Sequence, residues 1–105
     1  MTFQSPQSDM LPRSTLIIGD KVEEQGSGGK IAHVYPGNGS VTREITMAGP
    51  DDVDRAVAAA RAALPEWKAM PGDQRRNLLF RLAELLEAKS MDFAPSLISE
   101  NGSIA

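Results

Sequence analysis

The chain has 105 residues, of which 41% are hydrophobic, with a formal net charge of −3 and no cysteine. This length and composition suit one small globular domain. The 11 basic residues are scattered along the sequence, which excludes the basic stripe typical of a nucleic-acid-binding protein. Without cysteine there is no disulfide framework, no thiolate metal site and no thiol nucleophile.

The N-terminal segment is polar and contains neither the basic nor the apolar region of a signal peptide. Residues 1–13 are rich in Ser, Gln and Pro, which predicts a mobile tail. The longest aliphatic stretch that follows, at residues 16–18, is far too short to cross a membrane. We therefore expect a cytoplasmic protein that binds neither a membrane nor a nucleic acid.

Three short strands are predicted in the first half of the chain. The first covers residues 15–22 and is interrupted by a glycine-containing turn. The second covers residues 31–35 and is followed by four consecutive turn-forming residues. The third covers residues 40–47, where apolar and polar side chains alternate with the period of a strand.

Three helices are predicted in the second half, because the apolar period there changes from two residues to about 3.6. The first covers residues 51–69 and has acidic residues in its first turn, where they favour the helix dipole. The second begins with Pro71 as its first residue. The third is capped by Ser90 and closed by Asn101 and Gly102. A broad apolar face of the second helix carries Leu78, Leu79, Leu82, Leu85 and Leu86.

The glycine-rich stretch at residues 26–30 matches neither of two phosphate-binding motifs. Glu24 occupies the position of the first glycine of a P-loop, and Ile31 stands where Ser or Thr should follow the lysine. The dinucleotide fingerprint fails because Ile31 falls on its last glycine and no helix follows directly. The stretch is therefore interpreted as a flexible turn.

Other residues with catalytic chemistry are better explained by ordinary structural roles. His33 is the only histidine, and the residues near it do not supply the partners of a hydrolytic triad or metal cluster. Asp51, Asp52 and Asp54 resemble paired carboxylates, but a helix start gives acidic residues an electrostatic role. Trp67 is interpreted as a packing anchor. No catalytic residue is predicted.

Several motifs follow one another along the chain: the segments 16–22, 33–41 and 52–57, Trp67, an arginine at 75 or 76, the segment 82–87 and the segment 100–102. Their order and spacing resemble the opening part of the NAD(P)-dependent aldehyde dehydrogenases. The resemblance covers about residues 15–103. Two positions depart from the family pattern, because Tyr35 replaces an Asn before proline and Ser103 replaces the Lys that usually follows Asn-Gly.

The resemblance implies an α+β fragment, with short antiparallel strands followed by three helices. Residues 14–105 would form the N-terminal part of an aldehyde dehydrogenase domain and belong to the α/β cofactor-binding region of the larger fold. The family oxidises aldehydes with NAD or NADP through a cysteine thiolate. Since the chain contains no cysteine, we expect it to be truncated and inactive alone, with no cofactor-binding residue of its own.

The resemblance also implies a cation site and a partner. Some family members bind a monovalent cation, and the matching groups here are the carbonyls of His33 and Val34 and the carboxylate of Glu100. The implied partner is the missing remainder of the enzyme. An alternative function is a small interaction or oligomerisation module, in which the leucines of the second helix bind another protein or a second copy.

Overall fold

The first sheet is a short hairpin near the start of the chain. In the computed structural model, which describes residues 11–102, β1 (Leu16–Ile18) and β2 (Lys21–Glu23) pair in antiparallel fashion. A two-residue turn separates them, so the chain reverses where the sequence predicted one interrupted strand. The described chain therefore contains four strands, and the expected number of three is wrong.

A second antiparallel sheet is formed by β3 (Lys30–Val34) and β4 (Val41–Thr46). The hairpin between them is closed by Tyr35, whose N–H donates to the Ser40 carbonyl at 2.8 Å. The polar face of β4 is the buried one. Thr42 and Thr46 are buried, whereas Val41 is 64% exposed. On the apolar face of β4, Val41 is therefore open to solvent, whereas Ile45 is half-buried.

Three helices follow in the predicted order: α1 (Pro50–Ala69), α2 (Gly72–Ala88) and α3 (Ser90–Asn101). Three boundaries differ from the expectation by one residue, the first being the start of α1 at Pro50 in place of residue 51. Pro71 is the N-cap of α2 and lies just outside the helix, and Lys89, not Ser90, precedes α3. Helix ends commonly shift by this amount because the last turns have few backbone partners. No helix among the described residues is long and apolar enough to cross a membrane.

The predicted end of α3 is confirmed. Gly102 takes a left-handed conformation with φ of +72°, and its N–H donates to the Ile98 carbonyl at 2.9 Å. Glycine adopts this conformation without the steric cost that a Cβ atom brings. The α+β class, with short antiparallel strands ahead of three helices, is confirmed as well.

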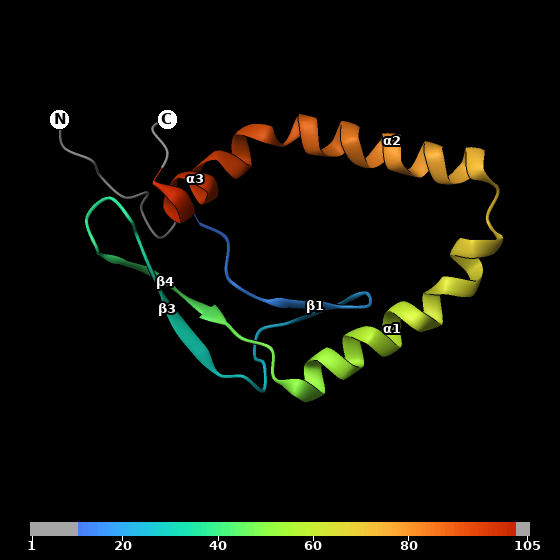
Figure 1. Cartoon of the computed structure of the whole chain (residues 1–105). Helices are drawn as coiled ribbons and strands as arrows, with labels where there is room; N and C mark the ends of the chain where they lie inside the picture. The colour runs from blue at the N-terminus through green and yellow to red at the C-terminus, as the bar shows by residue number, and fades with distance from the viewer. Residues whose placement is uncertain (1–10, 103–105) are drawn as a thin grey trace.

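The elements form an open arc in place of a packed core (Figure 1). The radius of gyration is 17.5 Å, whereas a compact domain of this length has about 13 Å. Among the described residues, Leu11 and Tyr35 are the buried apolar side chains. In α2 no residue is buried, and in α1 only Asp52 is. The apolar faces of both long helices are thus exposed.

The predicted tail at residues 1–13 is described only in part, since residues 1–10 lie outside the described residues. The three that are described contact the second sheet and the segment after β2. Leu11 is buried, and the Pro12 carbonyl accepts a hydrogen bond from Arg43 at 2.9 Å. Arg13 forms an ion pair with Glu24 at 2.9 Å.

Candidate functional site

A network of hydrogen bonds centred on Asp52 joins the first turn of α1 to the segments before it. The carboxylate accepts hydrogen bonds from the N–H of Gly49 at 3.0 Å and from the N–H and hydroxyl of Ser27 at 2.7 and 2.8 Å. Arg55 donates to Asp52 at 2.7 Å and to both carboxylate oxygens of Glu23 at 2.6 and 2.8 Å. One buried carboxylate therefore holds β2, the glycine-rich stretch and α1 together.

The charges in this network stabilise one another. The N–H of Gly49, the Arg55 guanidinium and the Ser27 donors hold the pKa of Asp52 far below its ordinary value. Arg55 likewise lowers the pKa of Glu23, and the two carboxylates raise the pKa of Arg55. Asp52 is thus ionised at neutral pH and has no spare proton to transfer. The network is suited to positioning and not to acid–base catalysis.

Sequence reasoning assigned Asp52 only to the helix dipole, and it missed Ser27 and Glu23. The hydrogen bond between Asp52 and Gly49 could have been predicted from the sequence. Asp52 is the third residue of α1, the position from which an acidic side chain accepts the N–H of the N-cap residue, here Gly49. No local pattern indicated the contact with Ser27, which is 25 residues away in sequence. Asp51 and Asp54 are exposed, as expected of acidic residues at a helix start.

The glycine-rich stretch is a turn, as predicted, but it is tied to the end of β4. The N–H of Gly28 donates to the Met47 carbonyl at 3.0 Å, and the N–H of Met47 donates to the Gly29 carbonyl at 2.9 Å. A Cβ atom at Gly26 would overlap the Met47 carbonyl oxygen. The glycines allow two backbones to approach closely, and the N–H groups of Gly28 and Gly29 both donate to backbone carbonyls.

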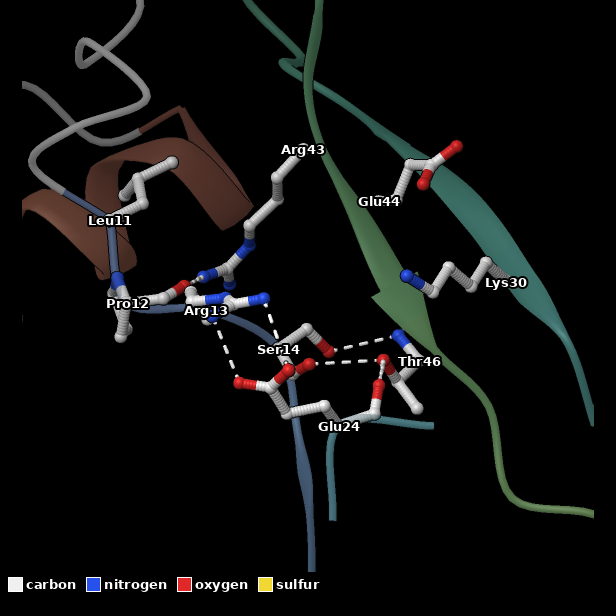
Figure 2. A pocket seen from close by; sticks show the side chains of 9 residues that line it. All are labelled: Leu11, Pro12, Arg13, Ser14, Glu24, Lys30, Arg43, Glu44 and Thr46. Carbon is white, nitrogen blue, oxygen red and sulfur yellow. Dashed lines mark hydrogen bonds and ion pairs between the residues drawn. The ribbon is translucent and has the colours of Figure 1, made fainter. Parts of the chain in front are cut away.

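A polar pocket of about 200 Å³ lies where the segment before β1 crosses β4 (Figure 2). The N–H of Thr46 donates to the Ser14 hydroxyl at 3.0 Å, and the Thr46 hydroxyl lies 3.0 Å from the Ser14 carbonyl and 3.2 Å from the Glu24 carbonyl. The pocket is lined by Leu11, Pro12, Arg13, Ser14, Glu24, Lys30, Arg43, Glu44 and Thr46.

The charged groups of this pocket largely balance. Arg13 is paired with Glu24 at 2.9 Å, and Arg43 with Glu100 of α3 at 3.3 Å. Lys30 and Glu44 add one charge of each sign to the lining. The pocket therefore does not concentrate charge of one sign, as a site for an ionic ligand would.

The residues of the predicted cation site come from two elements, since His33 and Val34 belong to β3 and Glu100 to α3. Arg43 pairs with His33 in the sheet register and also binds Glu100, which is 57 residues away. The His33 carbonyl lies 3.3 Å from the Thr42 hydroxyl, and the His33 ring Nδ1 lies 2.8 Å from the same oxygen. Oxygen ligands suit a hard cation. In this arrangement, however, the Arg43 guanidinium already supplies a positive charge to Glu100. The cation site, which includes Val34, stays a prediction.

Trp67 lies on α1, and three arginines, at positions 75, 76 and 81, lie on α2. Trp67 is 41% exposed, and its carbonyl accepts a hydrogen bond from Arg75 at 3.3 Å. Arg81 pairs with Glu84 at 3.3 Å, and both side chains are well exposed. Arg76 is exposed. Within residues 11–102, no group of three or more His, Asp or Glu side chains is arranged to hold a metal ion.

Comparisons of this sequence with known proteins all match it to one family. The sequence model of the Aldehyde dehydrogenase family matches residues 22–105. Vanillin dehydrogenase from Pseudomonas sp. is 39% identical over 87 residues, which are 83% of this chain and 18% of that protein. Betaine aldehyde dehydrogenase 1 from Rhizobium meliloti is 32% identical over 83 residues, 79% of this chain and 17% of that protein.

A second vanillin dehydrogenase, from Corynebacterium glutamicum, is 37% identical over 87 residues, 83% of this chain and 18% of that protein. The chain thus spans less than one fifth of the length of these relatives. The match covers the second sheet and all three helices described above. This chain belongs to the aldehyde dehydrogenase family, as a segment from the N-terminal part of the family's domain.

Proposed function

We propose that the chain is the N-terminal packing segment of an NAD(P)-dependent aldehyde dehydrogenase and does not catalyse the reaction alone. The complete enzyme would oxidise an aldehyde to a carboxylic acid in the cytoplasm and would bind NAD or NADP through residues outside this chain. The chain contains no cysteine to supply the thiolate nucleophile of that reaction. Its own contribution would be to pack against the remainder of the enzyme.

The observation that carries the proposal is the exposure of apolar side chains on α1 and α2. In α1, Val53, Val57 and Leu64 are each about half exposed, and the leucines of α2 are equally open. Monomeric proteins rarely leave large apolar helix faces in water. Covering it releases roughly 25 cal/mol per Å² of apolar area, so a partner surface is strongly favoured.

An apolar hollow of about 430 Å³ adds a second docking surface for the remainder of the enzyme. It lies between β1 and the first half of α1, where β1 runs inside the arc of helices (Figure 1). Its lining is almost wholly aliphatic and alanine side chains, which suit a packing contact better than the oriented binding of a polar substrate. The lining comprises Leu16, Ile17, Ile18, Ala48, Asp52, Val53, Ala56, Val57 and Ala60.

A chimera tests the packing role directly. The 87-residue stretch of the Pseudomonas vanillin dehydrogenase that matches this chain would be replaced by the corresponding stretch of this chain. We expect a folded chimera that oxidises vanillin with NAD or NADP, measured by absorbance at the nicotinamide band. A chimera that does not fold would contradict the proposal.

Two variants of the chimera separate packing from surface effects. Leu82→Asp adds a charge to the apolar face of α2, whereas Asn77→Asp adds the same charge outside that face. Burying an unpaired carboxylate is costly, so Leu82→Asp should lower the yield of active chimera at least tenfold. Asn77→Asp should leave it nearly unchanged, and equal effects of the two would argue against a buried α2 face.

The isolated chain should show no turnover. Purified protein would be incubated with NAD or NADP and with vanillin or betaine aldehyde, the substrates named for its relatives. We expect no reduced nicotinamide above a no-protein control, because the chain has no thiol. Reproducible turnover that follows the protein through purification would overturn the inactive assignment.

The cation site formed by His33, Val34 and Glu100 belongs to the same proposal. In a complete enzyme, Arg43 would compete with a cation for Glu100, which it contacts at 3.3 Å. Arg43→Gln should therefore strengthen the response of the chimera to K⁺ or Na⁺ at constant ionic strength. An identical response in both forms would argue against these residues as ligands.

A further inference from the structure

The tip of the hairpin between β3 and β4 carries a chemically reactive dipeptide. Asn38 is followed by Gly39, and the same Asn-Gly-Ser sequence occurs a second time at residues 101–103. Asparagine is one of the thermolabile residues of proteins. A glycine after it has no side chain to keep the next backbone nitrogen away from the amide. The chain therefore contains two sites of matched sequence at which an asparagine amide can be lost.

The hairpin holds the reacting groups of Asn38 close together. Asn38 is exposed, and its side-chain Oδ1 accepts a hydrogen bond from the Ser40 N–H at 3.0 Å. This contact is an Asx-turn, in which the side chain folds back over the peptide that follows it. The ring closed by the hydrogen bond contains both the amide carbon of Asn38 and the backbone nitrogen of Gly39. The two atoms that must join are therefore kept near each other.

The Ser40 N–H also assists the reaction electrostatically. When the Gly39 nitrogen attacks the amide carbon, negative charge develops on Oδ1, the atom to which the Ser40 N–H already donates. A donor aimed at a developing oxyanion lowers the barrier to its formation. We propose that Asn38 is a site of spontaneous deamidation in the folded chain, and that it is converted to aspartate and isoaspartate much faster than Asn101.

The reaction consumes only water and is started by hydroxide. Hydroxide removes the proton of the Gly39 N–H, and the nitrogen forms a bond to the amide carbon of Asn38. The bond from that carbon to the side-chain nitrogen breaks, and the nitrogen takes a proton from water and leaves as ammonia. Water then opens the resulting succinimide ring at either carbonyl. One opening gives aspartate, and the other gives isoaspartate, in which the backbone runs through the side chain.

Asn101 has the same following residues but a helical backbone, since it is the last residue of α3. In a helix the Cα–Cβ bond tilts toward the N-terminus, which carries the amide carbon away from the nitrogen of the next residue. That nitrogen belongs to Gly102, whose N–H donates to the Ile98 carbonyl at 2.9 Å. Attack at Asn101 therefore requires a change of backbone conformation as well as the release of this hydrogen bond.

A backbone hydrogen bond also slows the reaction at Asn38. The Gly39 N–H donates to the Tyr35 carbonyl at 2.9 Å, a bond of the same length as that of Gly102 in α3. The attacking nitrogen is thus protected equally at both sites. The difference between the sites lies in the asparagine side chain, which is folded over the next peptide at Asn38 and directed away from it at Asn101.

Peptide mapping by mass spectrometry measures both sites in one sample of the full chain, incubated at mildly alkaline pH. In native buffer we expect Asn38 to be converted at least tenfold faster than Asn101, with isoaspartate among the products. In concentrated urea the two Asn-Gly-Ser sites should react at rates within twofold of each other. Equal rates in native buffer, an unreactive Asn38, or a tenfold difference that persists in urea would each overturn the proposal.

Gly39→Ala tests which atom attacks. The added Cβ would meet no atom within 4 Å outside the adjacent residues, but it would crowd the succinimide ring. Conversion of Asn38 should slow at least fivefold, while the rate at Asn101 stays the same. The slowing should persist in urea, because it is steric and does not come from a loss of the hairpin. An unchanged rate at Asn38, or aspartate without isoaspartate, would mean direct hydrolysis of the amide and would exclude the proposed route.

Discussion

Asp52 holds neighbouring elements together by hydrogen bonds in a part of the chain that has few buried apolar side chains. Its carboxylate is buried and accepts hydrogen bonds from Gly49, Ser27 and Arg55. A buried carboxylate is tolerated only when donors surround it, and here backbone and side-chain donors do so together. The orientation of α1 relative to the first sheet therefore depends on an ionised group.

The pH dependence of stability follows from this network. The pKa of Asp52 is lowered in the folded chain, so its contribution is present at neutral pH and is lost progressively as the pH falls below the ordinary Asp pKa toward the lowered value. We expect urea unfolding, followed by circular dichroism, to shift to lower urea concentration between pH 7 and pH 3. Asp52→Asn should be less stable at pH 7 and should lose much of that dependence.

Asp51→Asn provides the control for this prediction. It removes the same charge from the same helical turn, but Asp51 is exposed and takes no part in the network. The Asp51→Asn chain should follow the natural chain across the pH range. If both variants behave alike, the helix dipole and not the network accounts for the role of Asp52.

Close backbone packing at Gly26 supports a second prediction. A Cβ atom there would overlap the Met47 carbonyl oxygen, which is part of the backbone and cannot move aside cheaply. Gly26→Ala should therefore lower the free energy of unfolding by more than about 1 kcal/mol.

The matched control is Gly72→Ala in α2, where the nearest atom is the end of the flexible Arg75 side chain at 3.9 Å. Because alanine favours a helix over glycine, Gly72→Ala should stabilise the chain slightly, by less than the roughly 0.5–1 kcal/mol of a mid-helix position, since Gly72 is the first residue of α2. Urea unfolding of both variants gives the comparison. The same sign for both would contradict the packing argument.

At the scale of elements, the end of α3 depends on the left-handed conformation of Gly102. Gly102→Ala would force a Cβ atom into this conformation at a cost of about 1–2 kcal/mol. We expect the last turn of α3 to fray in this variant. Fraying would appear as faster hydrogen exchange of the backbone N–H at position 102 and of those just before it. The strands should be unaffected, and unchanged exchange at the helix end would contradict the prediction.

The helices were well predicted from sequence because their signals are local. The change in apolar period after Gly49, the acidic first turn of α1 and the glycine after α3 all act within a few residues. The boundary errors at Pro71 and Ser90 were one residue each. The strands were predicted less accurately. A two-residue turn within residues 15–22 makes two paired strands, where the sequence indicated one interrupted strand.

The surroundings of the predicted cation site could be foreseen only in part. The sequence placed His33 on a strand and Glu100 near the end of a helix, as the structure has them. It gave no indication that Arg43 would bind Glu100, since the two are 57 residues apart and neither belongs to a recognisable motif. The assignment of a cation to these residues remains a prediction.

At the scale of the whole molecule, the described chain is an open arc with little apolar burial (Figure 1). The radius of gyration is 17.5 Å, well above the value of about 13 Å for a compact domain. Hydrophobic burial is the main favourable contribution to folding. The chain alone should therefore be far less cooperative than a complete domain of equal length.

Calorimetry tests this expectation. A compact domain of about 100 residues unfolds with an enthalpy of roughly 60–80 kcal/mol, and we expect less than about half of that for the isolated chain. The dye ANS should bind the exposed apolar faces under native conditions. A sharp transition with the full enthalpy, together with no dye binding, would mean that the chain folds as an independent domain.

By itself, the amino-acid sequence determined the order and type of the helices, the α+β class and the family of this chain. Those properties depend on hydrophobic period, turn residues and motif order, which are local or additive along the chain. Only the tertiary structure decided which residues surround Asp52, which carboxylate Arg43 binds, and which faces of α1 and α2 are exposed. Such contacts join residues as far as 57 positions apart, and no local pattern specifies them.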